Sequence, residues 1–265
     1  MGLLDPDRGC RSAHTFRHGH NGEVLGANAA AKRIDLQNLD FAVISHRHGD
    51  HMGGLAHLLT VNPTLTVWAP DEPFGVFGSQ LDATFPRADN SLAPHERYFD
   101  GNRDGIWKTG SAWPRADFHL VSAITEIAPG ITLIALVSDR PGTVELRELS
   151  LALDTPDGIV LVVGCSHPGI ANIVEAARPI NSEILCVVGG LHLLVAGDLE
   201  IASTVALLHD TYHVKYIAPG HCTGEPTLIA LKKVFGARCL YARVGSTLSL
   251  GGSPTTETQP RSTAK

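Results

Sequence analysis

Several features that would assign this chain to a class of protein are absent from its 265 residues. No run of apolar residues is long enough to span a bilayer. Lys and Arg number 21 against 27 Asp and Glu, and the net charge of -6 offers no attraction for nucleic acid or an anionic membrane. Residues 1–8 lack the charged-then-apolar pattern of a signal peptide. We therefore expect a cytoplasmic protein that binds neither nucleic acid nor a membrane.

Cysteine is also scarce, at five residues, an odd number. The five lie far apart and include no CxxC pair, which argues against a disulfide framework and against a Cys-type zinc finger. We expect Cys165 and Cys222 to be small buried residues beside a site rather than ligands. The remaining composition, 43% hydrophobic and 18% charged, is typical of a globular protein with one large domain or two small ones.

Apolar periodicity predicts an α/β protein, because strands and helices alternate through the second half of the chain. The first forty residues are polar and indicate irregular structure, and the long segment 71–114 is expected to cover or shape a pocket. We expect one domain over residues 1–252 and a disordered polar tail over 253–265. The predicted strands span residues 41–45, 65–69, 131–137, 150–153, 159–163, 184–188 and 214–218. One predicted helix begins near residue 52, and the others span 169–177, 201–209 and 227–235.

Four predicted strands run directly into a histidine. These histidines are His46, His167, His192 and His221. In open α/β sheets, ligands bind outside the carboxyl ends of the strands, so the four strands would deliver imidazoles to one edge. Glycines beside each histidine let the backbone turn tightly and approach a ligand closely.

The stretch SHRHGDHMGG at residues 45–54 is the sharpest signal in the sequence. His46 and His48, two apart in extended chain, point to the same side, while Asp50 and His51 lie in the turn toward a helix and can face a second centre. Imidazole and carboxylate suit Zn, Fe or Mn. Two metals about 3.5–4 Å apart would share a hydroxide of pKa about 7, which would be the nucleophile. A solvated polar loop is the alternative, but this spacing beside glycines favours a metal site.

The other candidates are weaker when each is taken alone. For His167 and His221 a structural histidine is the alternative, and for His192 the structural and the functional interpretations both stay open. Glu148 is a weak candidate for a partner that orients a ligand histidine. The remaining histidines lack a comparable context and are expected at the surface or in packing: His14, His18, His20, His57, His95, His119, His209 and His213.

At these residues the sequence resembles the metallo-β-lactamase superfamily, whose metal motif is HxHxDH after a short apolar strand. Three further stretches, GCSHPGI at 164–170, GGLHL at 189–193 and GHCTG at 220–224, resemble one branch of it. That branch is named after dihydropterin-methyl-ribofuranosylaminobenzene phosphate synthase. The resemblance spans roughly residues 22–249. It implies a four-layer αβ/βα sandwich: two mixed sheets face to face, helices outside and metals at one end.

The resemblance also implies a site with two divalent metal ions, zinc first, with iron or manganese as alternatives. Asp50 would orient the hydroxide as well as bind metal. His192 matches the branch's GGxH motif and would bind substrate, act as acid or base, or complete a metal shell. One metal would be held by His46, His48 and His167, and the other by Asp50, His51 and His221.

The sequence departs from the superfamily pattern in two places. A metal-bridging Asp is usual at a strand end, where this chain has Cys165, which leaves the second metal less secure. A Phe-Asp-x-Gly motif is usual near the amino end, where the nearest match is FRHG at 16–19, with Arg17 in place of the Asp. The amino-terminal strands are therefore expected to be shortened. An open sheet edge would follow, and a second copy of the chain could cover it as a homodimer.

The leading functional hypothesis is a metal-dependent hydrolase in which a metal-bound hydroxide cleaves an ester-type bond, such as a phosphoester or lactone, in a small molecule. One alternative is a synthase-like transferase that joins a dihydropterin to an aminobenzene ribotide. Another is a metal-binding sensor without turnover. The fold does not fix the substrate.

Overall fold

A computed structural model describes residues 22–72, 75–76, 91–97, 110–141, 143, 145–242, 244–249 and 255–258. The chain divides into two compact units. The first comprises Met1–Ser122 and Ala135–Leu149, and the second comprises Ala123–Ile134 and Ser150–Lys265. A single domain over residues 1–252 stays a prediction.

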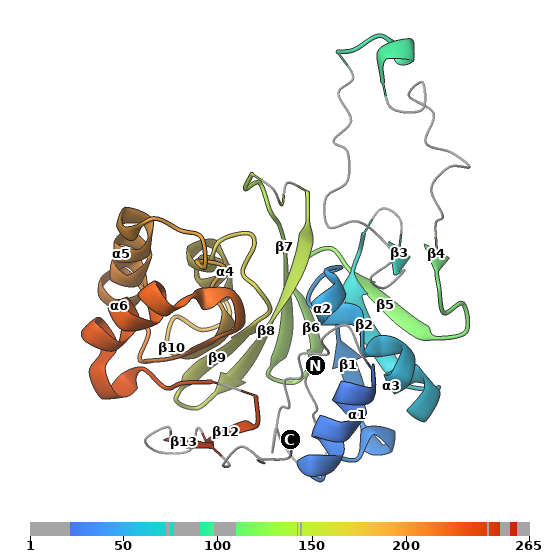
Figure 1. Ribbon diagram of the computed structural model, residues 1–265, viewed down its shortest axis with the longest axis horizontal. Coiled ribbons are helices and arrows are strands. Elements are labelled where there is room, and N and C mark those ends of the chain that lie inside the picture. The colour runs from blue at the N-terminus through green and yellow to red at the C-terminus, as the bar shows by residue number, and fades with distance from the viewer. Residues whose placement is uncertain are drawn as a thin grey trace, which may run out of the picture. The chain divides into compact units, whose positions relative to one another are not determined.

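The first unit contains a three-stranded parallel sheet, ordered β1-β2-β5 (Figure 1). In its register Phe41 pairs with Thr66, and Thr66 pairs with Asp117. The strands are short; β1 and β2 start within one residue of the predicted positions, whereas β5 lies where no strand was predicted. Their bounds are β1 Phe41–Val43, β2 Thr66–Pro70 and β5 Asp117–Val121.

Helices α1 (Gly22–Ala31) and α3 (Leu55–Val61) pack against each other in the core of the first unit. Leu25 and Leu58 are fully buried there. A Cβ at Gly26 would lie 2.8 Å from Nε2 of His57, so the glycine lets the two helices approach closely. The prediction of irregular structure is wrong over Gly22–Ala31, because the packing against α3 overrides the weak helix propensity of its glycines and asparagine. The short helices nearby are η1 Leu36–Asn38 and α2 Gly49–Met52.

A mixed six-stranded sheet, ordered β11-β10-β9-β8-β7-β6, forms the centre of the second unit. The end of β7 and the start of β8 are counted with the first unit. Strands β9, β10 and β11 run parallel to one another, and β8 pairs with β9 in the antiparallel direction. The bounds are β6 Thr125–Ala128, β7 Ile131–Val137, β8 Arg147–Thr155, β9 Gly158–Val163, β10 Ile184–Gly190 and β11 Tyr216–Gly220.

Three helices lie beside this sheet in Figure 1: α4, α5 and α6. Helix α4 contacts β9, α6 contacts β11, and α5 packs against α6. Burial along β9 and β10 is nearly continuous, as expected of parallel strands covered on both faces. The predicted alternation of strands and helices is confirmed. The helices are α4 Ile170–Ala177, α5 Asp198–Ala206, η5 Leu207–Thr211, η6 His221–Thr223, α6 Glu225–Phe235 and η7 Gly236–Arg238.

The remaining elements are short. Strands β3 (Gly75–Val76) and β4 (Gly110–Ser111) form a parallel pair, and η3 spans Pro94–Glu96. Most of the segment 71–114, which was expected to shape a pocket, lies outside the described residues, as does FRHG at 16–19. The segment expected to be a disordered tail contains β13 (Thr255–Thr258), which pairs antiparallel with β12 (Ser246–Ser249).

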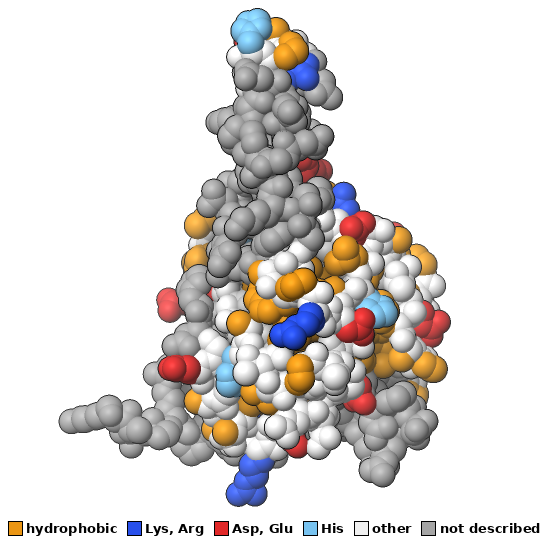
Figure 2. All heavy atoms as spheres, turned by 90° about the vertical axis from the view of Figure 1, so that its right-hand side faces the viewer, with side chains coloured by type: hydrophobic (Ala, Val, Ile, Leu, Met, Phe, Trp, Pro, Cys, Tyr) orange, Lys and Arg blue, Asp and Glu red, His pale blue; other side chains and the backbone are white. Residues whose placement is uncertain are grey.

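Within the described part of the chain, no helix has the length and apolar character needed to cross a membrane. On the face drawn in Figure 2, Lys and Arg side chains of the described residues stand singly among acidic and apolar ones.

Candidate metal centre

The first unit brings three histidines of the SHRHGDH stretch together just after β1. His46 is completely buried. Its ring centroid lies 4.7 Å from that of His48 and 4.0 Å from that of His51. Three imidazoles this close, on a segment that turns from a strand into a short helix, form a ready set of nitrogen donors.

The hydroxyl of Ser45 holds two of these rings. Its Oγ lies 3.0 Å from Nδ1 of His46 and 3.0 Å from Nδ1 of His51. If both rings carry their proton on Nδ1, the hydroxyl oxygen accepts from both, and each Nε2 keeps a lone pair for a metal. Ser45 therefore orients two candidate ligands with a single side chain.

Asp50 adds a carboxylate to the same set. Its Oδ2 lies 3.4 Å from Nε2 of His51, and the side chain is partly exposed, unlike the ring of His51. A carboxylate in contact with both solvent and an imidazole can bind a cation or orient a water molecule.

Between the two histidines of the motif, the side chain of Arg47 is buried and forms an ion pair with Glu72, with Nη1 and Oε1 2.6 Å apart. The same Oε1 accepts a hydrogen bond of 3.3 Å from the backbone N–H of Arg147. Burial raises the pKa of Glu72, and the neighbouring Arg47 charge opposes that shift. The pair anchors the segment that carries His46 and His48.

The second unit delivers three of the four predicted histidines to one edge of its sheet; the prediction is wrong for His46, because it follows β1, which belongs to the three-stranded sheet of the first unit. Strands β9, β10 and β11 are parallel neighbours, with Gly190 opposite Gly220 in the register, so their carboxyl ends meet at the same edge. The ring centroids of His167 and His192 lie 4.2 Å apart. His167 is 1% exposed, which is low for an imidazole.

Three non-glycine residues at this edge adopt left-handed backbone conformations. They are Ser166 (φ 65°), His192 (φ 51°) and His221 (φ 55°). Such conformations cost on the order of 1–3 kcal/mol each and persist only where the surroundings hold them. Here the Oγ of Ser166 donates a 2.7 Å hydrogen bond to the carbonyl of Gly190, which ties the ends of β9 and β10 together. Strain of this kind is typical of functional sites.

Two cysteine thiols lie in the same place. Sγ of Cys165 is 2.9 Å from Nε2 of His221, and Sγ of Cys222 is 3.6 Å from the carbonyl oxygen of Cys165. The pKa of Cys222 is lowered to about 4, mainly by a hydrogen bond with Cys165 and also by His192 and His221, while burial opposes the shift. The sequence interpretation treated both cysteines as bystanders. The GCSH and GHCTG stretches did indicate a functional region. The proximity of their two cysteines, however, depends on the order of the strands in the sheet.

The structure thus groups the predicted residues in two sets, one in each unit: His46, His48, Asp50 and His51 in the first, and His167, His192 and His221 in the second. Histidines expected to be structural have other partners. His119 pairs with Asp117, and His209 pairs with Asp210.

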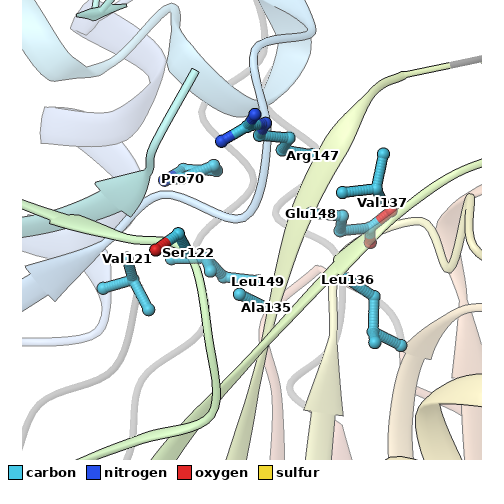
Figure 3. A pocket seen from close by; sticks show the side chains of 9 residues that line it. All are labelled: Pro70, Val121, Ser122, Ala135, Leu136, Val137, Arg147, Glu148 and Leu149. Atoms are coloured by element: carbon cyan, nitrogen blue, oxygen red, sulfur yellow. The ribbon is translucent and has the colours of Figure 1, made fainter. Parts of the chain in front are cut away.

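Glu148, the weak candidate for an orienting carboxylate, is buried at the start of β8. It lines a cavity of about 20 Å³ in the first unit, together with Val137 and Arg147 (Figure 3). In Figure 3 the Glu148 carboxylate lies on the Val137 side, and the Arg147 side chain extends toward Pro70. Room for about one water molecule is too little for a substrate, so this cavity is not a substrate site.

No family model matches the chain. A solved structure of a metal-dependent hydrolase of the β-lactamase superfamily is similar, with a TM-score of 0.61 and 27% sequence identity over 86% of this chain and 85% of that one. An uncharacterized protein of Methanocaldococcus jannaschii is 34% identical over 251 residues, which are 89% of this chain and 88% of the relative. From the same organism, 7,8-dihydropterin-6-methyl-4-(beta-D-ribofuranosyl)-aminobenzene-5'-phosphate synthase is 29% identical over 222 residues, 76% of this chain and 72% of the enzyme.

The chain has the fold of the metallo-β-lactamase superfamily, so the fold expected from its HxHxDH motif is confirmed. Within the superfamily it is similar to the dihydropterin-methyl-ribofuranosylaminobenzene phosphate synthase branch. The donor sets fit metal ions, because buried imidazoles gather beside a carboxylate in one unit and beside thiols in the other.

Proposed function

We propose that this protein is a metal-dependent hydrolase that cleaves an ester-type bond, a phosphoester, a lactone or a similar group, in a small molecule. The observation that carries the proposal is the convergence of His46, His48 and His51 after β1 in a chain of this superfamily. Divalent metals, when bound, supply a Lewis acid and a hydroxide nucleophile, because they lower the pKa of bound water to about 7.

The assignment of ligands follows the superfamily motif. His46, His48 and His167 would hold one metal ion, and Asp50, His51 and His221 would hold the other. Zinc is the first choice of metal, with iron or manganese as alternatives, since imidazole and carboxylate suit all three.

The chain's own residues then have separate tasks. Ser45 orients the rings of His46 and His51 through its hydroxyl. Asp50 would bind metal and orient the attacking hydroxide. His192, beside His167, contacts substrate or transfers a proton to the leaving group.

The test combines elemental analysis with a panel of phosphomonoester, phosphodiester, lactone and thioester substrates. We expect about two equivalents of metal and turnover of at least one class of substrate. His48→Ala should lose one equivalent and the activity together. His119→Ala, a change of an exposed histidine paired with Asp117, is the matched control and should keep both. An active variant that lacks the metal would refute the ligand assignment.

A second candidate function is a transferase that joins a dihydropterin to an aminobenzene ribotide. The 29% identity to the synthase of Methanocaldococcus jannaschii favours it. The two functions differ in one measurement, the release of phosphate or pyrophosphate. A hydrolase releases its product from a single substrate, whereas the transferase requires both. Bound metal without turnover on any substrate would indicate a sensor instead.

Location and partners stay predictions. The sequence indicates a cytoplasmic protein with a small-molecule substrate and no nucleic-acid or membrane partner, and a homodimer is proposed below.

A further inference from the structure

Two thiols and an imidazole converge at the carboxyl-end edge of β9, β10 and β11. The ligand atoms of Cys165, His221 and Cys222 all lie within 4.8 Å of one another. Sγ of Cys165 and Nε2 of His221 are 2.9 Å apart. We propose that Cys165 and Cys222 bind a divalent metal as thiolates together with His221. The inference rests on the proposed function, because it completes the shell of the metal assigned to His221.

The distances suit a metal without rearrangement of the backbone. Around a tetrahedral zinc, with Zn–S of about 2.3 Å and Zn–N of about 2.0 Å, neighbouring ligand atoms stand roughly 3.5–4 Å apart. The three ligand atoms lie within 4.8 Å of one another, and Sγ of Cys165 and Nε2 of His221 are 2.9 Å apart, so rotation of side chains would bring them to this spacing. The usual bridging Asp of the superfamily is replaced here by Cys165, and the thiolates restore the negative charge that this replacement removes.

Gly190, at the end of β10, makes room for the cluster. A Cβ at this position would come within 2.7 Å of Sγ of Cys222, within 2.7 Å of the carbonyl of Gly164 and within 3.1 Å of Cδ2 of His221. Its backbone is not left-handed, so space and not conformation requires the glycine. The absence of a side chain at Gly190 therefore leaves space for the thiol of Cys222 and the imidazole of His221, as a ligand-binding cluster requires.

A third cysteine shows what an ordinary buried thiol looks like in this sheet. Cys186, in β10, is fully buried, and its Sγ is 3.8 Å from the carbonyl oxygen of Val187. Burial raises its pKa to about 12. Among the described residues it belongs to no group of potential metal ligands, and it behaves as a small hydrophobic side chain. Cys165 and Cys222 differ from it in their partners rather than in their burial alone.

Thiolate ligands narrow the choice of metal. Soft sulfur donors select zinc, and cobalt as its spectroscopic substitute, over manganese, which prefers oxygen. The proposal therefore predicts that this centre binds Zn²⁺ or Co²⁺ far more tightly than Mn²⁺.

The experiment is a titration of the metal-free, reduced full-length protein with Co²⁺, followed by absorption spectroscopy. Direct coordination by Cys165 and Cys222 gives an intense near-ultraviolet band from thiolate-to-cobalt charge transfer, apart from the weak visible bands of the ion. Cys165→Ser and Cys222→Ser should each reduce this band and weaken Co²⁺ binding by about tenfold or more. Cys239→Ser, in a partly buried thiol outside the cluster, is the matched control and should change neither.

A second measurement on the unaltered protein covers the case in which a variant fails to fold. Zn²⁺ should protect two thiols from a disulfide reagent, and a chelator should expose them again. Visible bands of bound Co²⁺ without the charge-transfer band, or Zn²⁺ binding that protects no thiol, would overturn the inference and leave the metal hydrolase standing. Failure of the protein to bind Co²⁺ or Zn²⁺ at all would overturn the proposed function as well.

Discussion

Arg47 and Glu72 form an ion pair in the interior of the first unit, with 2.6 Å between Nη1 and Oε1 and 6% of each side chain exposed. The second oxygen, Oε2, is buried with no hydrogen-bond partner among the described residues. Burial accordingly raises the pKa of Glu72, and Arg47 lowers it. The motif that carries His46 and His48 is thus fastened to the protein interior by one charge pair.

Removal of the positive partner should therefore be costly. Arg47→Met leaves a buried carboxylate without its counter-charge, and we expect a loss of about 3–5 kcal/mol in the free energy of unfolding. The pKa of Glu72 in the folded variant should rise further above its ordinary value of 4.5. A carboxyl with a raised folded pKa takes up a proton on folding, so stability should increase as pH falls through the folded pKa toward the unfolded one. Urea unfolding between pH 8 and pH 5 measures both effects.

Two controls accompany this variant. Arg47→Met/Glu72→Gln removes both charges and should recover part of the stability, with little dependence on pH in that range. Arg178→Met breaks an exposed pair with Glu175 and should cost less than about 1 kcal/mol. Equal losses for Arg47→Met and Arg178→Met would contradict the structural role of the buried pair.

The Ser45 hydroxyl, 3.0 Å from Nδ1 of both His46 and His51, should control metal affinity more than stability. Ser45→Ala removes the group that fixes the two rings, and we expect metal affinity to fall by about 10–100-fold. Competition with a chromophoric chelator measures this change. Ser45→Thr keeps the hydroxyl and should retain most of the affinity. Unchanged affinity in Ser45→Ala would count against the positioning role.

Gly190 and Gly197 form a matched pair of glycines. Gly190→Ala places a Cβ against Sγ of Cys222 and against the carbonyl of Gly164, whereas Gly197→Ala meets nothing within 4 Å. We expect Gly190→Ala to cost roughly 1–3 kcal/mol and to weaken metal binding, and Gly197→Ala to change stability by only a few tenths of a kcal/mol. Thermal unfolding measures the stability of both variants, and metal titration measures their metal affinity. Equal stability of the two would mean that the end of β10 moves freely.

Removal of metal should lower thermal stability, since a ligand that binds only the folded state stabilises it by mass action. At a free metal concentration of about 100 times Kd the contribution is about 2.7 kcal/mol, or roughly 5–10 °C in Tm for a chain of this size. Scanning calorimetry before and after treatment with a chelator, and after addition of Zn²⁺, is the measurement. An unchanged Tm would show that no metal is bound under those conditions.

The proposed homodimer has a candidate surface in β5. In the described part of the three-stranded sheet, β5 is an edge strand, and its Leu120 is 48% exposed. Leu120→Lys should weaken association, because a charge on an edge strand opposes pairing with a second copy. Sedimentation equilibrium of both proteins tests this. A strict monomer over a wide range of concentration would rule the dimer out.

Much of the second unit could be predicted from sequence. β7 was predicted with its bounds Ile131–Val137, and β9 within one residue of Gly158–Val163, because continuous apolar runs between turn residues mark buried strands. Helix α1 was missed, since its glycines and asparagine carry little helix signal and only packing against α3 stabilises it. The motif residues His46, His48 and His51 were identified because their ligand chemistry is encoded at short spacing.

The sequence by itself determined which side chains can donate to a metal and that they follow the ends of strands, because strand ends and side-chain chemistry are local properties. Only the tertiary structure decided that the thiols of Cys165 and Cys222 meet at His221. Cys165 follows β9, whereas His221 and Cys222 are adjacent residues after β11. The approach of Cys165 to them depends on the order and register of β9, β10 and β11, which no local spacing records. The same holds for Arg47 and Glu72, whose ion pair joins positions 25 residues apart through the packing of the first unit.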